Sequence, residues 1–224
     1  MSVCTLWRSS IVKKWLVAIT GLVMVGFLLG HMAGNLQMFL GRGPSPEATK
    51  INEYAAFLKA NPALLWGTRI VLLFSVLLHI VTTISLTRQN RKARPESYAL
   101  RASVASNLAS RTMIFGGLTL LFYIIYHLLH FTLGCVHQEL FTYPDVYQTV
   151  LSSFQIPLIS GVYIVAQIAL YFHLVHGISS AGETLGVSHP RYRECLNRIG
   201  IATATLICGG FISIPVGVLT GLIS

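Results

Sequence analysis

Four histidines lie inside long apolar stretches of the chain, where an ionisable side chain is costly and marks a candidate functional site. They are His31, His79, His127 and His173, and they recur about every 48 residues, each toward the end of its apolar stretch. An imidazole nitrogen binds haem iron and other transition metals, and it also hydrogen-bonds neighbouring helices. Either role explains one such histidine, but four in a regular arrangement require a shared explanation.

The elements that must position these histidines are membrane-spanning helices, because 54% of the 224 residues are apolar, 10% are charged and the mean hydropathy is +0.67. The apolar residues form five runs, each close to the roughly 20 residues that a helix needs to cross about 30 Å of hydrocarbon. This composition argues against a soluble fold and excludes a collagen-like, disulfide-rich or disordered chain. We predict an all-α integral membrane bundle, with one domain over residues 1–224 and spans at about 15–40, 63–86, 112–133, 156–180 and 199–223.

The net charge of +9 is unevenly distributed between the segments that flank these spans. One set of alternate segments holds twelve basic residues, whereas the other holds Arg42, Lys50 and Lys59, with Arg69 just inside the second span. The positive-inside rule therefore predicts a cytoplasmic N-terminus and an external C-terminus. The charge is a topology signal rather than a sign of nucleic-acid binding, although such a face can dock an acidic partner subunit or anionic membrane lipid. The twelve residues are Arg8, Lys13, Lys14, Arg88, Arg91, Lys92, Arg94, Arg101, Arg111, Arg191, Arg193 and Arg198.

Helix geometry predicts that the four histidines form two pairs at two depths. His31 and His127 each follow the cytoplasmic end of their span by sixteen residues, about 24 Å along a helix. His79 and His173 precede the cytoplasmic end of theirs by nine and ten residues, about 14 Å. Facing helices of a bundle can present one imidazole to each face of a haem, so two stacked bis-histidine haems b are the economical interpretation.

Other metal centres fit these residues less well. Neither level offers the three or four ligands, with polar neighbours, that zinc and copper prefer. The four cysteines are far apart and form no CxxC pair, and Cys135-Val136-His137 lacks the second cysteine of a CxxCH motif. A haem in this chain is therefore expected to be held without covalent attachment.

Small residues lie within one helical turn of the proposed ligands. They are Gly30, Gly34, Ser75, Thr82 and Gly177, and they would let a flat macrocycle approach the helix backbone. Ordinary close packing of membrane helices explains each of them equally well.

The segments between the spans are short. Gly41-Arg42-Gly43-Pro44-Ser45-Pro46 is predicted to break the first helix, and the polar stretch that follows is expected to hold a short amphipathic helix around Tyr54 and Phe57. The third loop, residues 134–155, carries Glu139 and Asp145 but no lysine or arginine.

The sequences around the four histidines resemble the ligand segments of a known family, the single-chain di-haem cytochrome b membrane anchor, often called the b558 type, of succinate dehydrogenases and quinol:fumarate reductases. The resemblance runs from Trp15 to the fifth span and includes Asn52-Glu53-Tyr54 and Asn61-Pro62. Each motif is short, but the four in this order and spacing are specific. They are Phe27-Leu28-Leu29-Gly30-His31-Met32, Leu77-Leu78-His79, Tyr126-His127-Leu128-Leu129-His130, and Phe172-His173-Leu174-Val175-His176-Gly177 with Gly186 thirteen residues after His173.

The resemblance implies a place in the respiratory chain and the tricarboxylic acid cycle. In this family a flavoprotein subunit with FAD interconverts succinate and fumarate in the cytoplasm, and an iron-sulfur subunit passes electrons to the anchor. The expected electron path joins an inner haem, on His79 and His173, to an outer haem, on His31 and His127, and to a quinone, with menaquinone first among the candidates. The resemblance also implies a multi-pass protein of the bacterial cytoplasmic membrane, in a complex that can be a dimer of heterotrimers. Nothing in this chain resembles a succinate site.

Two further histidines compete for the ligand positions, since His130 and His176 each follow a proposed ligand by three residues on the same helix face. The family pattern favours His127, which matches its single helix III histidine, and His173, because glycines follow it at plus four and plus thirteen. His130 and His176 are then candidates for hydrogen bonds to haem propionates or between helices. Arg111 is a further candidate for a propionate contact, although it also fits a simple topology role.

A quinone site needs hydrogen-bond donors and a route for protons. Glu53 precedes the second span, and fumarate-reducing relatives carry a glutamate in a similar place, so the resemblance makes Glu53 the candidate; a solvated loop residue is the alternative. Relatives can also carry a glutamate two residues before the helix IV ligand, and here that position is Tyr171.

Two other classes of function remain open. One is the haem b subunit of another membrane oxidoreductase, such as a hydrogenase or formate dehydrogenase. The other is a haem-free transporter or assembly scaffold, although the sequence has no broken helix or inverted repeat around a central site.

Overall fold

The computed structural model describes residues 9–93, 108–187 and 189–224, and every regular element among them is helical. Five helices are long and apolar enough to cross a membrane, over Ser10–Leu40, Pro62–Lys92, Met113–Thr132, Pro157–Thr184 and Pro190–Leu219. The predicted five-span all-α bundle is thereby confirmed. The elements are α2 (Ser10–Asn35), η1 (Leu36–Leu40), η2 (Pro46–Ala48), α3 (Lys50–Ala60), α4 (Pro62–Ala93), α5 (Leu108–His127), the π-helical turn η3 (Leu128–Thr132), η4 (Gln138–Leu140), α6 (Val146–Phe154), α7 (Pro157–Thr184) and α8 (Pro190–Leu219).

Local chemistry explains where several helices begin and end. The Ser9 side chain caps α2 by accepting a hydrogen bond from the Val12 amide at 3.4 Å. Pro157 and Pro190 stand in the first turns of α7 and α8, where a missing amide hydrogen costs nothing. The first span ends at Gly41, whose φ of +76° suits a residue without a side chain.

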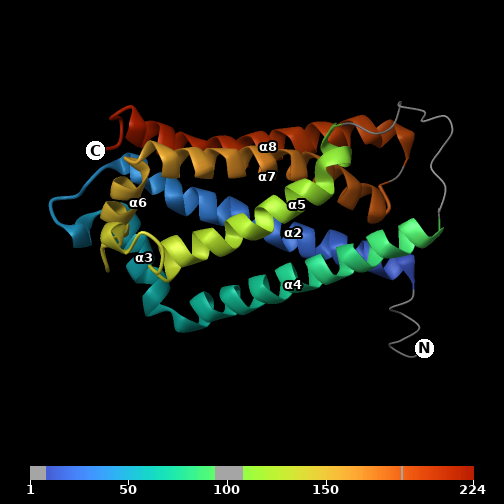
Figure 1. Ribbon diagram of the computed structural model, residues 1–224, viewed down its shortest axis with the longest axis horizontal. Coiled ribbons are helices and arrows are strands. Elements are labelled where there is room, and N and C mark those ends of the chain that lie inside the picture. Colours follow the sequence, from blue (N-terminus) through green and yellow to red (C-terminus); the bar gives the residue numbers. More distant parts are fainter. Residues whose placement is uncertain (1–8, 94–107, 188) are drawn as a thin grey trace.

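The bundle has a packed side and an open side. Helix α7 packs against α8, α5 and α2, whereas α4 packs mainly along α2 and diverges from the other helices (Figure 1). Gly200 allows close packing of α7 and α8, because a Cβ there would lie 2.9 Å from the Val175 carbonyl oxygen. The candidate functional site lies in the space between α4 and the α5–α7 pair.

The two ends of the bundle differ. We call the end that holds Lys13, Lys14, Arg88 and Arg91 the basic end, and the end covered by α3 and α6 the cap end (Figure 1). Helix α3 confirms the short helix predicted around Tyr54 and Phe57. Helix α6 lies in a loop for which no helix was predicted.

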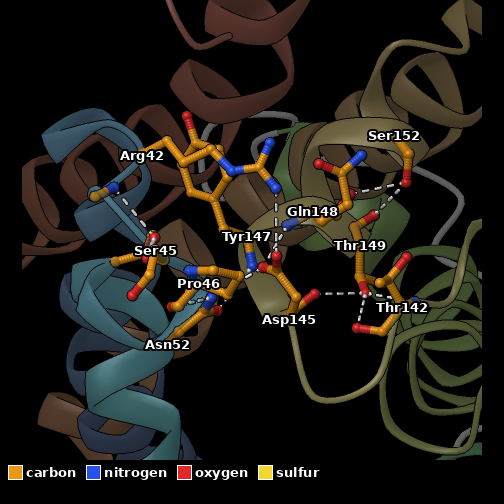
Figure 2. A network of polar contacts seen from close by, with 12 residues as sticks. Arg42, Ser45, Pro46, Asn52, Thr142, Asp145, Tyr147, Gln148, Thr149 and Ser152 are labelled. Atoms are coloured by element: carbon orange, nitrogen blue, oxygen red, sulfur yellow. Dashed lines mark hydrogen bonds and ion pairs between the residues drawn. The ribbon is translucent and has the colours of Figure 1, made fainter.

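A polar network centred on Asp145 joins α3 to α6 at the cap end (Figure 2). The Asp145 carboxylate accepts hydrogen bonds from the Gln148 amide and the Asn52 side chain, both at 2.9 Å, and pairs with Arg42 at 3.4 Å. The Tyr147 amide donates to the Asn52 side chain at 3.0 Å. Burial alone would raise the pKa of Asp145, but the hydrogen bonds and the Arg42 charge outweigh it and leave the pKa below its ordinary value.

Candidate functional site

A cavity of about 2280 Å³ runs along the open side of the bundle between α2, α4, α5 and α7. Its walls are mostly apolar, and it extends from Lys14 and Trp15 at the basic end to Phe141 and Tyr143 at the cap end. A small-molecule pocket occupies about 300–1,000 Å³, so this cavity is large enough for more than one such group. The four histidines proposed as ligands all line it: His31, His79, His127 and His173.

The histidine pair nearer the basic end is His79 of α4 and His173 of α7, with ring centroids 6.4 Å apart. Thr20 of α2 lies 3.0 Å from His79 Nδ1 and donates its own hydroxyl hydrogen to the Leu16 carbonyl at 2.6 Å. With the hydroxyl hydrogen on the Leu16 carbonyl, the hydroxyl oxygen accepts from His79 Nδ1–H, and this arrangement corresponds to the tautomer that carries its hydrogen on Nδ1. His79 Nε2 then keeps a free lone pair, as a metal ligand requires.

The pair nearer the cap end is His31 of α2 and His127 of α5, with ring centroids 5.9 Å apart and ring planes at 82°. Aromatic rings surround both imidazoles. Phe27 stacks on His31 at 5.1 Å, and Tyr123 and Phe131 each lie 5.8 Å from His127. The two pairs are about 16 Å apart along α2, since eleven residues separate Thr20, beside His79, from His31.

This donor set fits two bis-histidine haems. Two imidazoles that bind one metal from opposite sides, each at about 2 Å, have ring centroids separated by roughly 6 Å. Nδ1 of His127 and Nδ1 of His173 are buried without a hydrogen-bond partner among the described residues. No group of three or more His, Cys, Asp or Glu side chains in those residues could hold a metal ion, so each level offers two nitrogens and not a zinc-like cluster.

The small residues predicted to admit a macrocycle differ in their surroundings. Gly30 and Gly177 line the cavity, and a Cβ at either would meet nothing within 4 Å. A Cβ at Gly34 would lie 2.6 Å from the Tyr54 ring, so this glycine serves the packing of α3 on α2. Ser75 and Thr82 are buried and do not line the cavity.

His130 does not share the face of His127, because α5 passes into the π-helical turn immediately after His127. A π turn is wider than an α turn, so residues three apart point further away from each other. His130 is 1% exposed and hydrogen-bonds Tyr163 and Ser153, each at 3.1 Å. Of the roles open to it, the structure thus shows helix-to-helix hydrogen bonds. His176 stays on the regular face of α7 and lines the cavity one turn beyond His173, toward the basic end.

The structure describes the side chain of one of the two other predicted site residues. Glu53 is exposed on α3, pairs with Lys50 at 2.7 Å and does not line the cavity. Arg111 belongs to α5, but its side chain lies outside the described residues. Charged residues that line the cavity include Lys14, Arg88 and Glu183 at the basic end and Lys59 and Arg69 toward the cap end.

Sequence reasoning missed four polar residues that shape the site. Thr20 orients His79, and Tyr123, Tyr163 and Gln167 line the cavity between or beside the pairs. A polar side chain deep inside a predicted span is by itself a sign of a functional site, and Gln167 is such a residue. The others could not be recognised, because threonine and tyrosine are common in membrane helices.

Comparison of the chain with protein-family models, with curated proteins and with solved structures finds no match.

Proposed function

We propose that this chain is a membrane-anchoring di-haem cytochrome b, which carries electrons between the iron-sulfur subunit of a succinate dehydrogenase or quinol:fumarate reductase and a membrane quinone. The two histidine pairs carry the proposal: they face one apolar cavity at two depths, with ring centroids 5.9 and 6.4 Å apart. The resemblance of the four histidine segments supports the choice of family and of menaquinone as the first quinone to test.

Each residue of the site has a definite role in the proposal. His31 and His127 hold one haem, His79 and His173 hold the other, and bound haem supplies reversible one-electron transfer at its iron. Thr20 orients His79 through the contact with its Nδ1. The apolar walls of the cavity exclude water from both levels, which favours electron transfer over side reactions.

The partner subunits are proposed to dock at the basic end. Exposed positive charge is concentrated there, and the charge distribution predicts that this end is cytoplasmic. A complementary acidic face on the iron-sulfur subunit would place its clusters next to the His79–His173 level. Dicarboxylate chemistry belongs to the flavoprotein subunit.

The first test is a reduced-minus-oxidised absorption spectrum of the purified complex, with a pyridine haemochromogen assay of haem b per chain. We expect two haems b in the native protein and a lower content after His31→Ala, His79→Ala, His127→Ala or His173→Ala. His189→Ala is the matched control, because this histidine caps α8 outside the cavity. A well-folded preparation without haem would refute the proposal.

The co-purifying subunits test the assignment to a family. We expect a flavoprotein with covalent FAD and an iron-sulfur protein. A molybdenum or nickel-iron enzyme in their place would assign the chain to a formate dehydrogenase or hydrogenase and leave the haem sites intact.

A further inference from the structure

Gln167 of α7 and Tyr123 of α5 line the cavity at a depth between the two histidine pairs. Gln167 precedes His173 by six residues, about 9 Å along α7, and Tyr123 precedes His127 by four residues, about 6 Å along α5. The two side chains meet across the helices, where the Gln167 amide nitrogen donates to the Tyr123 hydroxyl oxygen at 3.3 Å. A polar pair thus stands in an apolar wall near the middle of the membrane.

The hydrogen bonding of this pair is incomplete within the described residues. Gln167 is 5% exposed, and its Oε1 is buried with no partner. Tyr123 accepts the bond from Gln167, so its own hydroxyl hydrogen is left to donate elsewhere. Exchanging the amide oxygen and nitrogen of Gln167 would not remove the deficit, because one end of the amide would still lack a partner.

An unpartnered amide is especially costly at membrane depth, where no bulk water can replace the missing partner. Buried polar atoms of this kind are commonly satisfied by an ordered water molecule with two to four hydrogen bonds. The wall offers one free acceptor, Gln167 Oε1, and one free donor, the Tyr123 hydroxyl. A water molecule matches both, since it can donate to the first and accept from the second.

We propose that Gln167 and Tyr123 bind an ordered water molecule in the cavity wall between the two histidine levels. Tyr123 lies 5.8 Å from His127, so the water lies closer to the cap-end pair than to the basic-end pair. Neither residue is among the proposed haem ligands. Its effect on electron transfer rests on the proposed function: a polar group near a haem stabilises the charged ferric state and lowers the reduction potential.

The direct test is an experimental structure of the complete complex in lipid nanodiscs, at a resolution that shows other ordered waters within the bundle. We expect density for one water within hydrogen-bond distance of Gln167 Oε1 and Tyr123 Oη, and its loss in Gln167→Leu, which keeps a similar volume. Absence of that density in the native protein, a protein group bonded to Oε1, or a larger molecule in its place would overturn the inference. Haem density in the same map tests the proposed function separately.

A redox titration then measures what the water does. Gln167→Leu and Tyr123→Phe should raise the midpoint potential of the cap-end haem more than that of the basic-end haem. Tyr126→Phe is the matched control, since it removes a hydroxyl from the same helix at a residue that bonds His137 and does not line the cavity. Equal shifts in all three variants, or a larger shift at the basic-end haem, would contradict the inference.

Discussion

The two histidine pairs line one cavity but are oriented in different ways. At the basic-end pair, the hydroxyl of Thr20, on a third helix, α2, lies 3.0 Å from His79 Nδ1 and orients this imidazole through a hydrogen bond. At the cap-end pair, the Asn35 amide on the same helix lies 3.3 Å from His31 Nδ1, and neighbouring rings, including Phe27 and Tyr163, pack on His31 and His127. A hydrogen bond fixes one atom of an imidazole, whereas ring packing fixes its plane.

The surroundings of the two pairs differ as well. The cap-end pair is the one nearer to the end of the bundle that α3 and α6 cover, and the Asp145 network joins these two helices (Figures 1 and 2). The basic-end pair lies in regular helix, and charged residues line the cavity toward both of its ends, including Arg88 and Glu183 at the basic end and Lys59 and Arg69 toward the cap end. We therefore expect two haems with different potentials and different sensitivity to mutation.

The largest effect is expected from double substitutions that test the pairing itself. His31→Ala with His127→Ala should leave one haem b per chain, as should His79→Ala with His173→Ala. A cross-level combination, His79→Ala with His127→Ala, should leave none, because each level loses one axial ligand. The haemochromogen assay measures haem b per chain. One retained haem in the cross-level variant would contradict the assignment of these histidines to two pairs.

The next effect separates the cap end from the rest of the bundle. Asp145→Ala removes the cap of α6 and the carboxylate that Asn52 and Arg42 contact, which should cost about 2 kcal/mol of stability. The thermal unfolding midpoint in detergent should fall, and the spectrum of the cap-end haem should change before that of the basic-end haem. Glu139→Gln, on an exposed neighbouring residue, is the control and should have little effect.

Lowering the pH should cause part of the stability loss that is expected for Asp145→Ala. The pKa of Asp145 is lower in the folded protein than its ordinary value, so its contribution to stability is complete above the ordinary pKa of about 4. That contribution is lost as the pH falls through the lowered value. Thermal midpoints measured against pH should therefore decline less steeply below that range in Asp145→Asn than in the native chain. Identical pH profiles would show that the carboxylate carries no such stability.

A smaller effect is expected at the basic-end pair. Thr20→Val removes the hydroxyl beside His79 Nδ1 and should weaken retention of the basic-end haem by about 10-fold, with a higher potential for that haem alone. Thr119→Val on the exposed face of α5 is the matched control. A shift confined to the cap-end haem would contradict the assignment of Thr20 to His79.

The smallest effect is expected at Glu53. Its ion pair with Lys50 is exposed, so Glu53→Gln should change stability by less than about 0.5 kcal/mol. The carboxylate lies outside the cavity, and we expect quinone turnover to be unchanged. A large loss of turnover would instead support the proton-handling role that the family resemblance assigns to this residue.

The sequence alone determined the five spans, the break at Gly41 and the short helix before the second span, because hydropathy and turn chemistry are local properties. It also indicated which histidines should lie at the same depth, since depth along a helix follows from residue count. Helix α6 was missed, although Asp145 three residues before Gln148 is an N-cap signal.

Only the tertiary structure decided which way the side chains at each depth point. The π turn after His127 directs His130 toward Tyr163 and Ser153, and the rotation of α2 brings Thr20 to His79. The same packing brings Gln167 against Tyr123 in the cavity wall. Residue count fixes the height of a side chain along its helix, but its direction depends on turn width and on helix rotation. The contacts between helices set both of these.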